Sequence, residues 1–225
     1  MDEPTQKNST WMKDEDTGAD DILNRSGLTP LQSILGEIDI ATAGASSETL
    51  VTVTDLAIEI AREGREGRRI GTLFTVGSES EVLAHSGCLI LDPLAGHPPE
   101  ERSIQDPNLR ETIKELAQLD GGFVVSGEGT VLSACRYFES TLPHSRQPLG
   151  LGTRHIAAAS ISAVTGAITV VVSESSIVRL YARGMLVNEI LPELWLLHRH
   201  MPHIAKPILT SDHVQNLAIV SERPQ

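Results

Sequence analysis

Short runs of β-branched and aliphatic residues recur along the chain, and stretches with helical spacing separate them. Residues 70–76, 168–172 and 178–182 have the length and composition of buried strands. The apolar runs at 123–125 and 131–135 flank a glycine-rich tetrad, which predicts a hairpin. Aromatic residues make up only 3% of the chain, so its core must be aliphatic. The alternation predicts an α/β fold with helices packed on a sheet.

Four segments are expected to be helical. The first has Ser46 or Ser47 as its cap and carries apolar residues on one face. The second starts at Asp106-Pro107, a capping residue followed by proline at the first helical position. Residues 155–164 form an alanine-rich helix, and residues 189–200 are expected to form the last ordered helix.

The chain is expected to have three parts. Residues 1–45 are acidic and poor in apolar side chains, which predicts a flexible tail, although a short amphipathic piece around 31–40 can dock. Residues 46–205 form the globular domain with its flanking helices, and residues 206–225 form a C-terminal extension.

The chain carries a formal net charge of -12 and has a sequence pI near 5.0. Most of its surface therefore repels nucleic acid and anionic membranes. No stretch approaches the roughly 18 apolar residues of a membrane span, and the N-terminal residues lack the apolar core of a signal peptide. We therefore expect a cytoplasmic protein that binds neither nucleic acid nor membrane.

The first candidate site segment is Asp120-Gly121-Gly122, directly before a predicted strand. Two glycines after a carboxylate allow another backbone or a ligand to approach the acid closely. The same residue types also form ordinary turns. Taken alone, the segment leaves both interpretations open.

A second segment, Gly152-Thr153-Arg154-His155, leads into the predicted alanine-rich helix. Free N–H groups at a helix N-terminus bind anions, and the arginine fork suits phosphate. A plain helix cap is the alternative. The third segment, Ser173-Glu174, follows an apolar run, so its side chains are candidates for a metal or ribose contact at a strand end or for a solvated turn.

Together the three segments resemble the diadenylate cyclase domain, the catalytic module of the DNA-integrity-scanning protein and of membrane-bound cyclic di-AMP synthases. The resemblance rests on Leu-Asp-Gly-Gly at 119–122, Leu-Gly-Thr-Arg-His at 151–155 and Val-Val-Val-Ser-Glu at 170–174. It extends over residues 69–186 and is greatest with the stand-alone, archaeal-like branch. It implies the diadenylate cyclase fold, an α/β domain with a central twisted mixed β-sheet flanked by helices.

The resemblance also implies a reaction: two ATP molecules condense into cyclic di-AMP and release two pyrophosphates. A face-to-face homodimer, or a higher homo-oligomer, would bring the two ATP molecules together, with Mg²⁺ or Mn²⁺ as cofactor. It implies catalytic roles for Asp120, Arg154 and His155, and metal binding by Asp120 and Glu174. The ATP-binding residues that it implies are Gly121, Gly122, Gly152, Thr153, Arg154, His155, Ser173 and Glu174.

Three positions depart from the family pattern. Gly122 stands where the family usually has alanine, Ser175 where it commonly has glutamate, and Ile156 where it has a second arginine. The loss of that arginine removes a phosphate contact. One alternative is therefore a catalytically weak relative that binds ATP or cyclic di-AMP as a sensor. Another is a scaffold with a vestigial nucleotide site, whose acidic tail recruits a partner.

Overall fold

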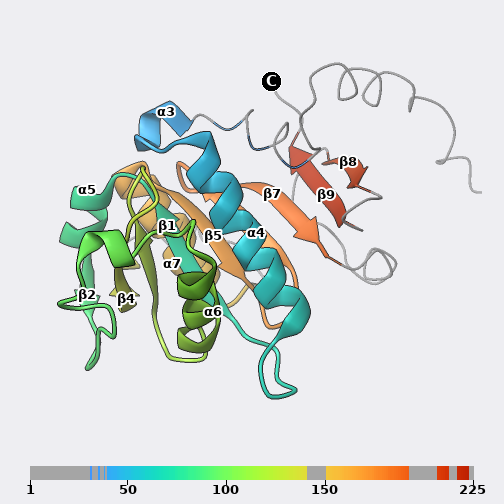
Figure 1. Ribbon diagram of the computed structural model, residues 1–225. Helices are drawn as coiled ribbons and strands as arrows, with labels where there is room; N and C mark the ends of the chain where they lie inside the picture. The colour runs from blue at the N-terminus through green and yellow to red at the C-terminus, as the bar shows by residue number, and fades with distance from the viewer. Residues whose placement is uncertain are drawn as a thin grey trace, which may run out of the picture.

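The computed structural model describes residues 40–140, 151–192, 207–212 and 217–222, together with Leu31, Leu35 and Ile38. The described strands form one nine-stranded sheet with the order β2-β4-β3-β1-β5-β6-β7-β9-β8 (Figure 1). The strands are β1 (Thr72–Val76), β2 (Ser86–Cys88), β3 (Gly122–Val125), β4 (Val131–Phe138), β5 (Ile168–Val172), β6 (Val178–Ala182), β7 (Met185–Leu191), β8 (Pro207–Asp212) and β9 (Leu217–Glu222). The helices are α3 (Ile40–Ala43), α4 (Ser47–Glu63), α5 (Glu79–Ala84), α6 (Pro107–Leu116) and α7 (Thr153–Thr165), with a short 3₁₀ helix at Pro99–Glu101.

The sheet is mixed, as expected. Strands β1 and β3 are parallel, and the other neighbouring pairs are antiparallel. The predicted hairpin is the β3–β4 pair, and the predicted strands at 168–172 and 178–182 are β5 and β6. The α/β fold with a mixed sheet and flanking helices is therefore confirmed.

Helices cover both faces of the sheet. Successive residues of a strand point to opposite faces, and β1 shows how the two cores divide. Phe74 stacks on Phe123 at 4.9 Å between ring centroids and belongs to the large aliphatic core that includes the buried side of α4. Leu73 belongs to a smaller core with Ala158 and Ile161 of α7. Figure 1 shows α4 lying across one face, with β2 and β8 at opposite edges of the sheet.

Local capping chemistry determines where the helices begin. The Ser46 hydroxyl accepts a hydrogen bond from the Thr49 N–H at 3.0 Å, so Ser46 is the cap of α4. The Asp106 carboxylate likewise accepts from the Asn108 N–H at 2.9 Å at the start of α6. Both predicted helix starts are confirmed. Helix α7 also forms as expected and ends at Gly166 in the left-handed conformation.

The prediction of a helix beginning at Glu189 is wrong, because residues 189–191 belong to β7. Glu189 lies directly opposite Arg179 of β6, and its carboxylate Oε1 is 2.6 Å from the arginine Nε. Both side chains are almost completely buried. A buried carboxylate needs such a charged partner, and the cross-strand pairing provides it. Residues 193–200 of the predicted helix lie outside the described residues.

Both ends of the described chain contact the core or the sheet. Leu31 and Leu35 are buried, and Ile38 packs against the large core, which agrees with docking of the predicted amphipathic piece. At the other end, β9 pairs with β7 and β8 pairs with β9. The predicted C-terminal extension therefore shares its sheet with the predicted domain. The three-part division of the chain stays a prediction.

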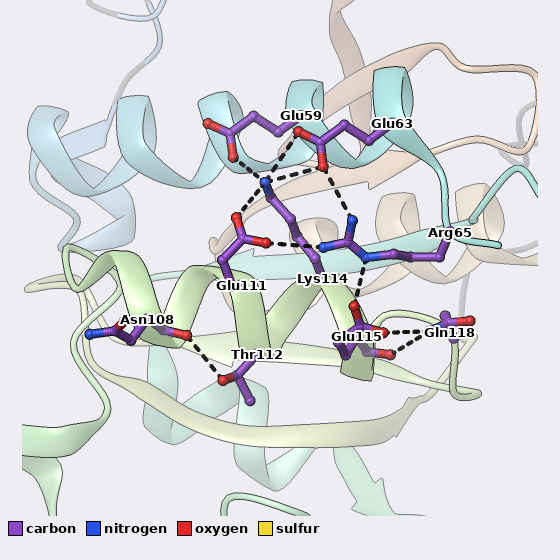
Figure 2. A network of polar contacts seen from close by, with 9 residues as sticks. All are labelled: Glu59, Glu63, Arg65, Asn108, Glu111, Thr112, Lys114, Glu115 and Gln118. Atoms are coloured by element: carbon purple, nitrogen blue, oxygen red, sulfur yellow. Dashed lines mark hydrogen bonds and ion pairs between the residues drawn. The ribbon is translucent and has the colours of Figure 1, made fainter. Parts of the chain in front are cut away.

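A set of charged side chains joins α4 to α6 (Figure 2). The Lys114 ammonium lies 3.0 Å from a Glu59 carboxylate oxygen, 3.3 Å from one of Glu63 and 2.8 Å from one of Glu111. We call this set the α4–α6 ion network; its members are Glu59, Glu63, Arg65, Arg110, Glu111, Lys114 and Glu115. Because the two helices are distant in sequence, the network is a tertiary contact. Within the described part of the chain, no helix combines the length and apolar character needed to cross a bilayer.

Candidate active site

The three predicted site segments meet at one end of the sheet. Asp120-Gly121 precede β3, and Ser173-Glu174 follow β5. Strand β1 is parallel to β3 and antiparallel to β5, with Thr72 opposite Val172. The starts of β1 and β3 therefore lie beside the end of β5, and the first turn of α7 faces the same end. The topology explains why residues more than fifty positions apart share one site.

Two adjacent pockets occupy this end of the molecule. The first, of about 380 Å³, is called the Asp120 pocket; it is lined by Leu73, Asp120, Gly121, Arg136, Tyr137, Phe138, Ser140, Thr153, Arg154 and Ala157. The second, of about 240 Å³, is called the Glu174 pocket; it is lined by Gly152, Thr153, Arg154, His155, Val171, Val172, Ser173 and Glu174. Thr153 and Arg154 line both pockets, so they form the wall between them. Among the predicted ATP-binding residues, Gly122 lines neither.

Asp120 carries an exposed carboxylate two residues before the start of β3. No hydrogen bond or ion pair joins it to the residues that the structure describes. Gly121 has φ of 96°, and a Cβ there would lie 2.6 Å from the carbonyl carbon of Cys135. A Cβ on Gly122 would overlap the Leu73 carbonyl oxygen. Both glycines therefore serve the close approach of neighbouring backbone, and this packing fixes where Asp120 stands.

Arg154, in the first turn of α7, pairs with Glu174 in the β5–β6 turn. Its Nη1 lies 3.1 Å from the Glu174 Oε1, and the two side chains are 39% and 68% exposed. An ion pair this exposed contributes little to stability. Among described residues, Glu174 is the one partner of the Arg154 guanidinium. Because Arg154 lines both pockets, its remaining N–H groups are available to an anionic ligand there.

The N-terminus of α7 has the features of an anion-binding site. Gly152 is its cap residue and offers no side chain to the first-turn N–H groups. The Thr153 and Arg154 N–H groups come first in the helix and have no intrahelical acceptor. A glycine cap with an arginine beside it favours the phosphate interpretation of this segment over that of a plain side-chain cap.

His155 points mainly into the core, with 5% of its surface exposed. Its Nδ1 lies 3.2 Å from the hydroxyl oxygen of Tyr181 on β6. Burial raises the pKa of the Tyr181 phenol well above its ordinary value, so the phenol stays protonated. The contact holds the first turn of α7 against the sheet. His155 is among the residues that line the Glu174 pocket, and its contact with ligand stays a prediction.

Ser173 stabilises the turn that carries Glu174. Its hydroxyl oxygen accepts a hydrogen bond from the Ser175 N–H at 3.1 Å and lies 2.6 Å from the Ser175 hydroxyl oxygen. This is the ordinary turn chemistry of serine. The turn places Glu174 beside Arg154, so the turn and ligand interpretations of this segment are compatible.

The two predicted metal ligands, Asp120 and Glu174, line different pockets. In the described part of the chain, no group of three or more His, Cys, Asp or Glu side chains is arranged to hold a metal ion. Mg²⁺ is commonly held by one or two carboxylates and by substrate phosphates, with no full protein cage. The exposed Asp120 carboxylate, in a pocket that also includes the first residues of α7, fits that mode.

Sequence reasoning assigned no role to several residues that line the site, and three residues at the site bear on its chemistry. Arg136 and Tyr137 of β4 line the Asp120 pocket, and Gly71 lies against Arg154, since a Cβ there would be 2.6 Å from Nη1. Arg136 is held in place by the Ser86 hydroxyl and carbonyl oxygens, both 2.9 Å away. These residues lie in or beside strands without a local motif, so only the tertiary fold reveals them.

Comparison with known proteins identifies the family of the chain. The family model "DisA bacterial checkpoint controller nucleotide-binding" matches residues 59–186. The chain belongs to this family. The match covers the region over which the sequence resembled diadenylate cyclases and confirms that resemblance.

Two curated archaeal proteins are similar in sequence. The diadenylate cyclase of Methanocaldococcus jannaschii is 49% identical over 142 residues, which are 63% of this chain and 45% of that protein. The diadenylate cyclase of Haloferax volcanii is 35% identical over 158 residues, 69% of this chain and 57% of that protein. The chain thus matches about half the length of these relatives.

Two solved structures are also similar. A hypothetical membrane spanning protein from Bacillus cereus aligns with a TM-score of 0.46 and 21% identity over 62% of each chain. A double mutant of DacA from Staphylococcus aureus aligns with a TM-score of 0.42 and 22% identity, over 62% of this chain and 84% of that one.

Proposed function

We propose that this protein is a diadenylate cyclase that condenses two ATP molecules into cyclic di-AMP and two pyrophosphates. One observation carries the proposal: Thr153 and Arg154 form a common wall between a pocket with an exposed carboxylate and a pocket at a helix N-terminus. The first pocket suits a nucleoside with its ribose hydroxyl near Asp120. The second suits a polyphosphate. Family membership and the two curated relatives support the same activity.

In this proposal the triphosphate binds at the start of α7. The N–H groups of the first turn, the Thr153 hydroxyl and the Arg154 guanidinium neutralise its negative charge. Arg154 is presented by the first turn of α7, so its guanidinium is already at the pocket wall when phosphate arrives. The ribose and base extend into the Asp120 pocket, where the exposed Tyr137 offers an apolar surface.

Two equivalent displacements complete the reaction. Each ribose 3′-oxygen attacks the α-phosphorus of the other ATP, and the bond from that phosphorus to the pyrophosphate oxygen breaks. Asp120 accepts the proton of the attacking hydroxyl, and pyrophosphate leaves with the electron pair of the broken bond. The main task of the protein is to hold two polyanions in line and to offset the charge that develops on the phosphoryl oxygens.

Mg²⁺ or Mn²⁺ is the expected cofactor, held by the Asp120 carboxylate, with Glu174 as a second candidate ligand, and by substrate phosphate oxygens. Such an ion, when bound, would offset phosphate charge and lower the pKa of the attacking hydroxyl. Glu174 already pairs with Arg154 through Oε1, so a metal ion there would have to use Oε2 or displace the arginine. The assignment of Asp120 is therefore the simpler of the two.

The reaction requires two copies of the chain. One site accommodates one ATP, so two sites must face each other across a two-fold axis for both bonds to form. The proposal therefore includes a homodimer, at least during turnover, and leaves higher assembly open. Nucleic acid and membrane are not expected partners of so acidic a chain, and a cytoplasmic location, where ATP is made and used, stays part of the proposal.

A nucleotide sensor is the second candidate function. Ile156 places an apolar, partly buried side chain on the first turns of α7, where the family has a second arginine. With one cation fewer for the phosphates, binding can persist while turnover falls. Calorimetry that detects ATP or cyclic di-AMP binding, in a preparation that makes no product, would favour the sensor.

The experiment is to incubate the pure protein with ATP and Mn²⁺ or Mg²⁺ and to measure cyclic di-AMP by mass spectrometry. Asp120→Asn keeps the size of the side chain and removes the base, so we expect product formation to fall by about 100-fold or more. Asp106→Asn is the matched control, because asparagine caps a helix as well as aspartate does. Undiminished product from Asp120→Asn, or none from the unchanged protein, would refute the proposal.

A further inference from the structure

Gly71 is a buried glycine immediately before β1 whose presence the backbone does not explain. It is absent from the residues with positive φ, which include nine other glycines of the described chain. Its conformation is thus open to any amino acid. The reason for a glycine here has to be space.

The space in question is taken by the Arg154–Glu174 pair. A Cβ on Gly71 would lie 2.6 Å from Arg154 Nη1, 3.1 Å from Arg154 Cζ and 3.3 Å from Glu174 Cγ. In proteins, a Cβ atom essentially never lies within 3.0 Å of a non-bonded heavy atom. The guanidinium therefore occupies the volume that any other residue at this position would fill.

Sheet register explains the contact. Thr72 pairs with Val172, so Gly71 lies beside the residues that follow β5, and these are Ser173 and Glu174. Helix α7 starts beside the same strand ends, and its Arg154 side chain lies against the backbone of Gly71. Gly71 thus lies directly against the Arg154–Glu174 ion pair, whose two side chains remain partly exposed.

We propose that Gly71 is a positioning residue for the phosphate-binding arginine. Because Gly71 has no side chain, the Arg154 guanidinium can lie against its backbone, and this space, which we call the seat, sets the direction of the guanidinium. The inference rests on the proposed cyclase function and deepens it. Arg154 and Glu174 are both substantially exposed, so their ion pair alone restrains the guanidinium weakly. Contact with the Gly71 backbone removes one side of its accessible volume and pre-organises it for phosphate.

Gly71→Ala tests the seat. The atoms that the new methyl group would displace belong to the ends of two flexible side chains and not to backbone. We therefore expect the thermal midpoint to stay close to that of the unchanged protein, while kcat/KM for ATP falls about 10- to 100-fold because Arg154 is displaced. Gly87→Ala is the matched control: Gly87 lies in a strand, has no positive φ, and a Cβ there meets nothing within 4 Å.

A double-mutant cycle with Arg154→Lys separates positioning from a general effect. Lysine has its Nζ where arginine has Cζ, but it lacks the Nη atoms, and Nη1 is the atom that the methyl group would meet most closely. If Gly71 acts through the guanidinium, Gly71→Ala changes kcat/KM much less in the Arg154→Lys protein than in the unchanged one. Equal effects in both backgrounds would overturn the inference, and so would early melting of Gly71→Ala.

Two readouts keep this inference separate from the cyclase proposal. The first is the affinity for ATP by calorimetry, and the second is a crystal structure of Gly71→Ala. Loss of the 3.1 Å Arg154–Glu174 contact together with weaker ATP binding supports the seat, even if the unchanged protein makes no cyclic di-AMP. A cyclase whose Gly71→Ala variant keeps that contact and full activity confirms the function and overturns the seat. A protein that binds no ATP overturns both.

Discussion

The α4–α6 ion network and the Arg154–Glu174 pair differ in how deeply the positive charge is buried and in how many carboxylates surround it. In the network, Lys114 is 6% exposed and lies between 2.8 and 3.3 Å from three carboxylates (Figure 2). At the site, Arg154 is 39% exposed and contacts one carboxylate among the described residues. The network holds two helices together, whereas the pair lies over two pockets.

The difference indicates which charges are structural. Burial alone would lower the pKa of Lys114, but the hydrogen bonds that its ammonium donates to Glu111, Glu59 and Glu63 outweigh burial and hold that pKa above its ordinary value. The carboxylates of the network therefore neutralise its positive charge within the fold. Arg154 stands beside a helix N-terminus that adds to its positive charge, and among the described residues only the Glu174 carboxylate pairs with it.

The largest expected effect comes from the same substitution in both regions. Arg154→Ala should lower cyclic di-AMP formation by about 100-fold or more, because it removes a charged donor to the phosphates, and should leave the thermal midpoint nearly unchanged. Arg110→Ala removes the 2.6 Å contact with Glu59 and should leave activity nearly unchanged. Activity assays and thermal melts of both proteins test the comparison; a large loss of activity in Arg110→Ala would break it.

Features that depend on neighbouring residues were predictable from the sequence. A serine or aspartate before an amphipathic run caps a helix by bonding to N–H groups two or three residues on, so Ser46 and Asp106 could be identified. The glycine-rich tetrad of the β3–β4 hairpin and the Gly152-Thr153 helix start are equally local. Their relative positions followed from the resemblance to the family.

Features that depend on distant residues were not predictable. The sequence places Gly71 within the predicted strand at 70–76 and gives it no role of its own, and its contact with Arg154 exists only because β1 starts beside the end of β5. The leucines after 189 predict a helix, and the sequence alone does not show that Glu189 has a buried partner, Arg179, on β6. Charge pairing across the sheet outweighed local helical spacing.

The second prediction, of intermediate size, concerns Lys114→Met. Methionine keeps the apolar stem of the side chain and removes the ammonium, so three carboxylates of the network lose their common partner. Because those carboxylates are 38–65% exposed, they can be rehydrated, and we expect a loss of only about 1–2 kcal/mol in the free energy of unfolding. Urea denaturation measures this loss. Cyclic di-AMP formation per folded molecule should not change, and a fall in it would show that the two regions are coupled.

The smallest expected effect is a difference in acid sensitivity at Glu111. Hydrogen bonding to Lys114, with further help from Arg65, holds the pKa of the Glu111 carboxyl below its ordinary value of 4.5. A lowered pKa in the folded state means that the ionised form stabilises the fold above pH 4.5 and that this contribution disappears as the pH falls through the lowered pKa. Glu111→Gln should therefore melt slightly earlier than the unchanged protein near neutral pH.

That difference in melting temperature should shrink steadily below pH 4.5, where the glutamate in the unchanged protein becomes protonated. Thermal melts of the two proteins from pH 7 to pH 3 measure it. The control is the same pair in the Lys114→Met background, where the main cause of the pKa shift is gone and the pH dependence of the difference should be weaker. A difference that stays constant across this range would mean that Glu111 contributes through packing, and that the network is held together by less charge pairing than its geometry indicates.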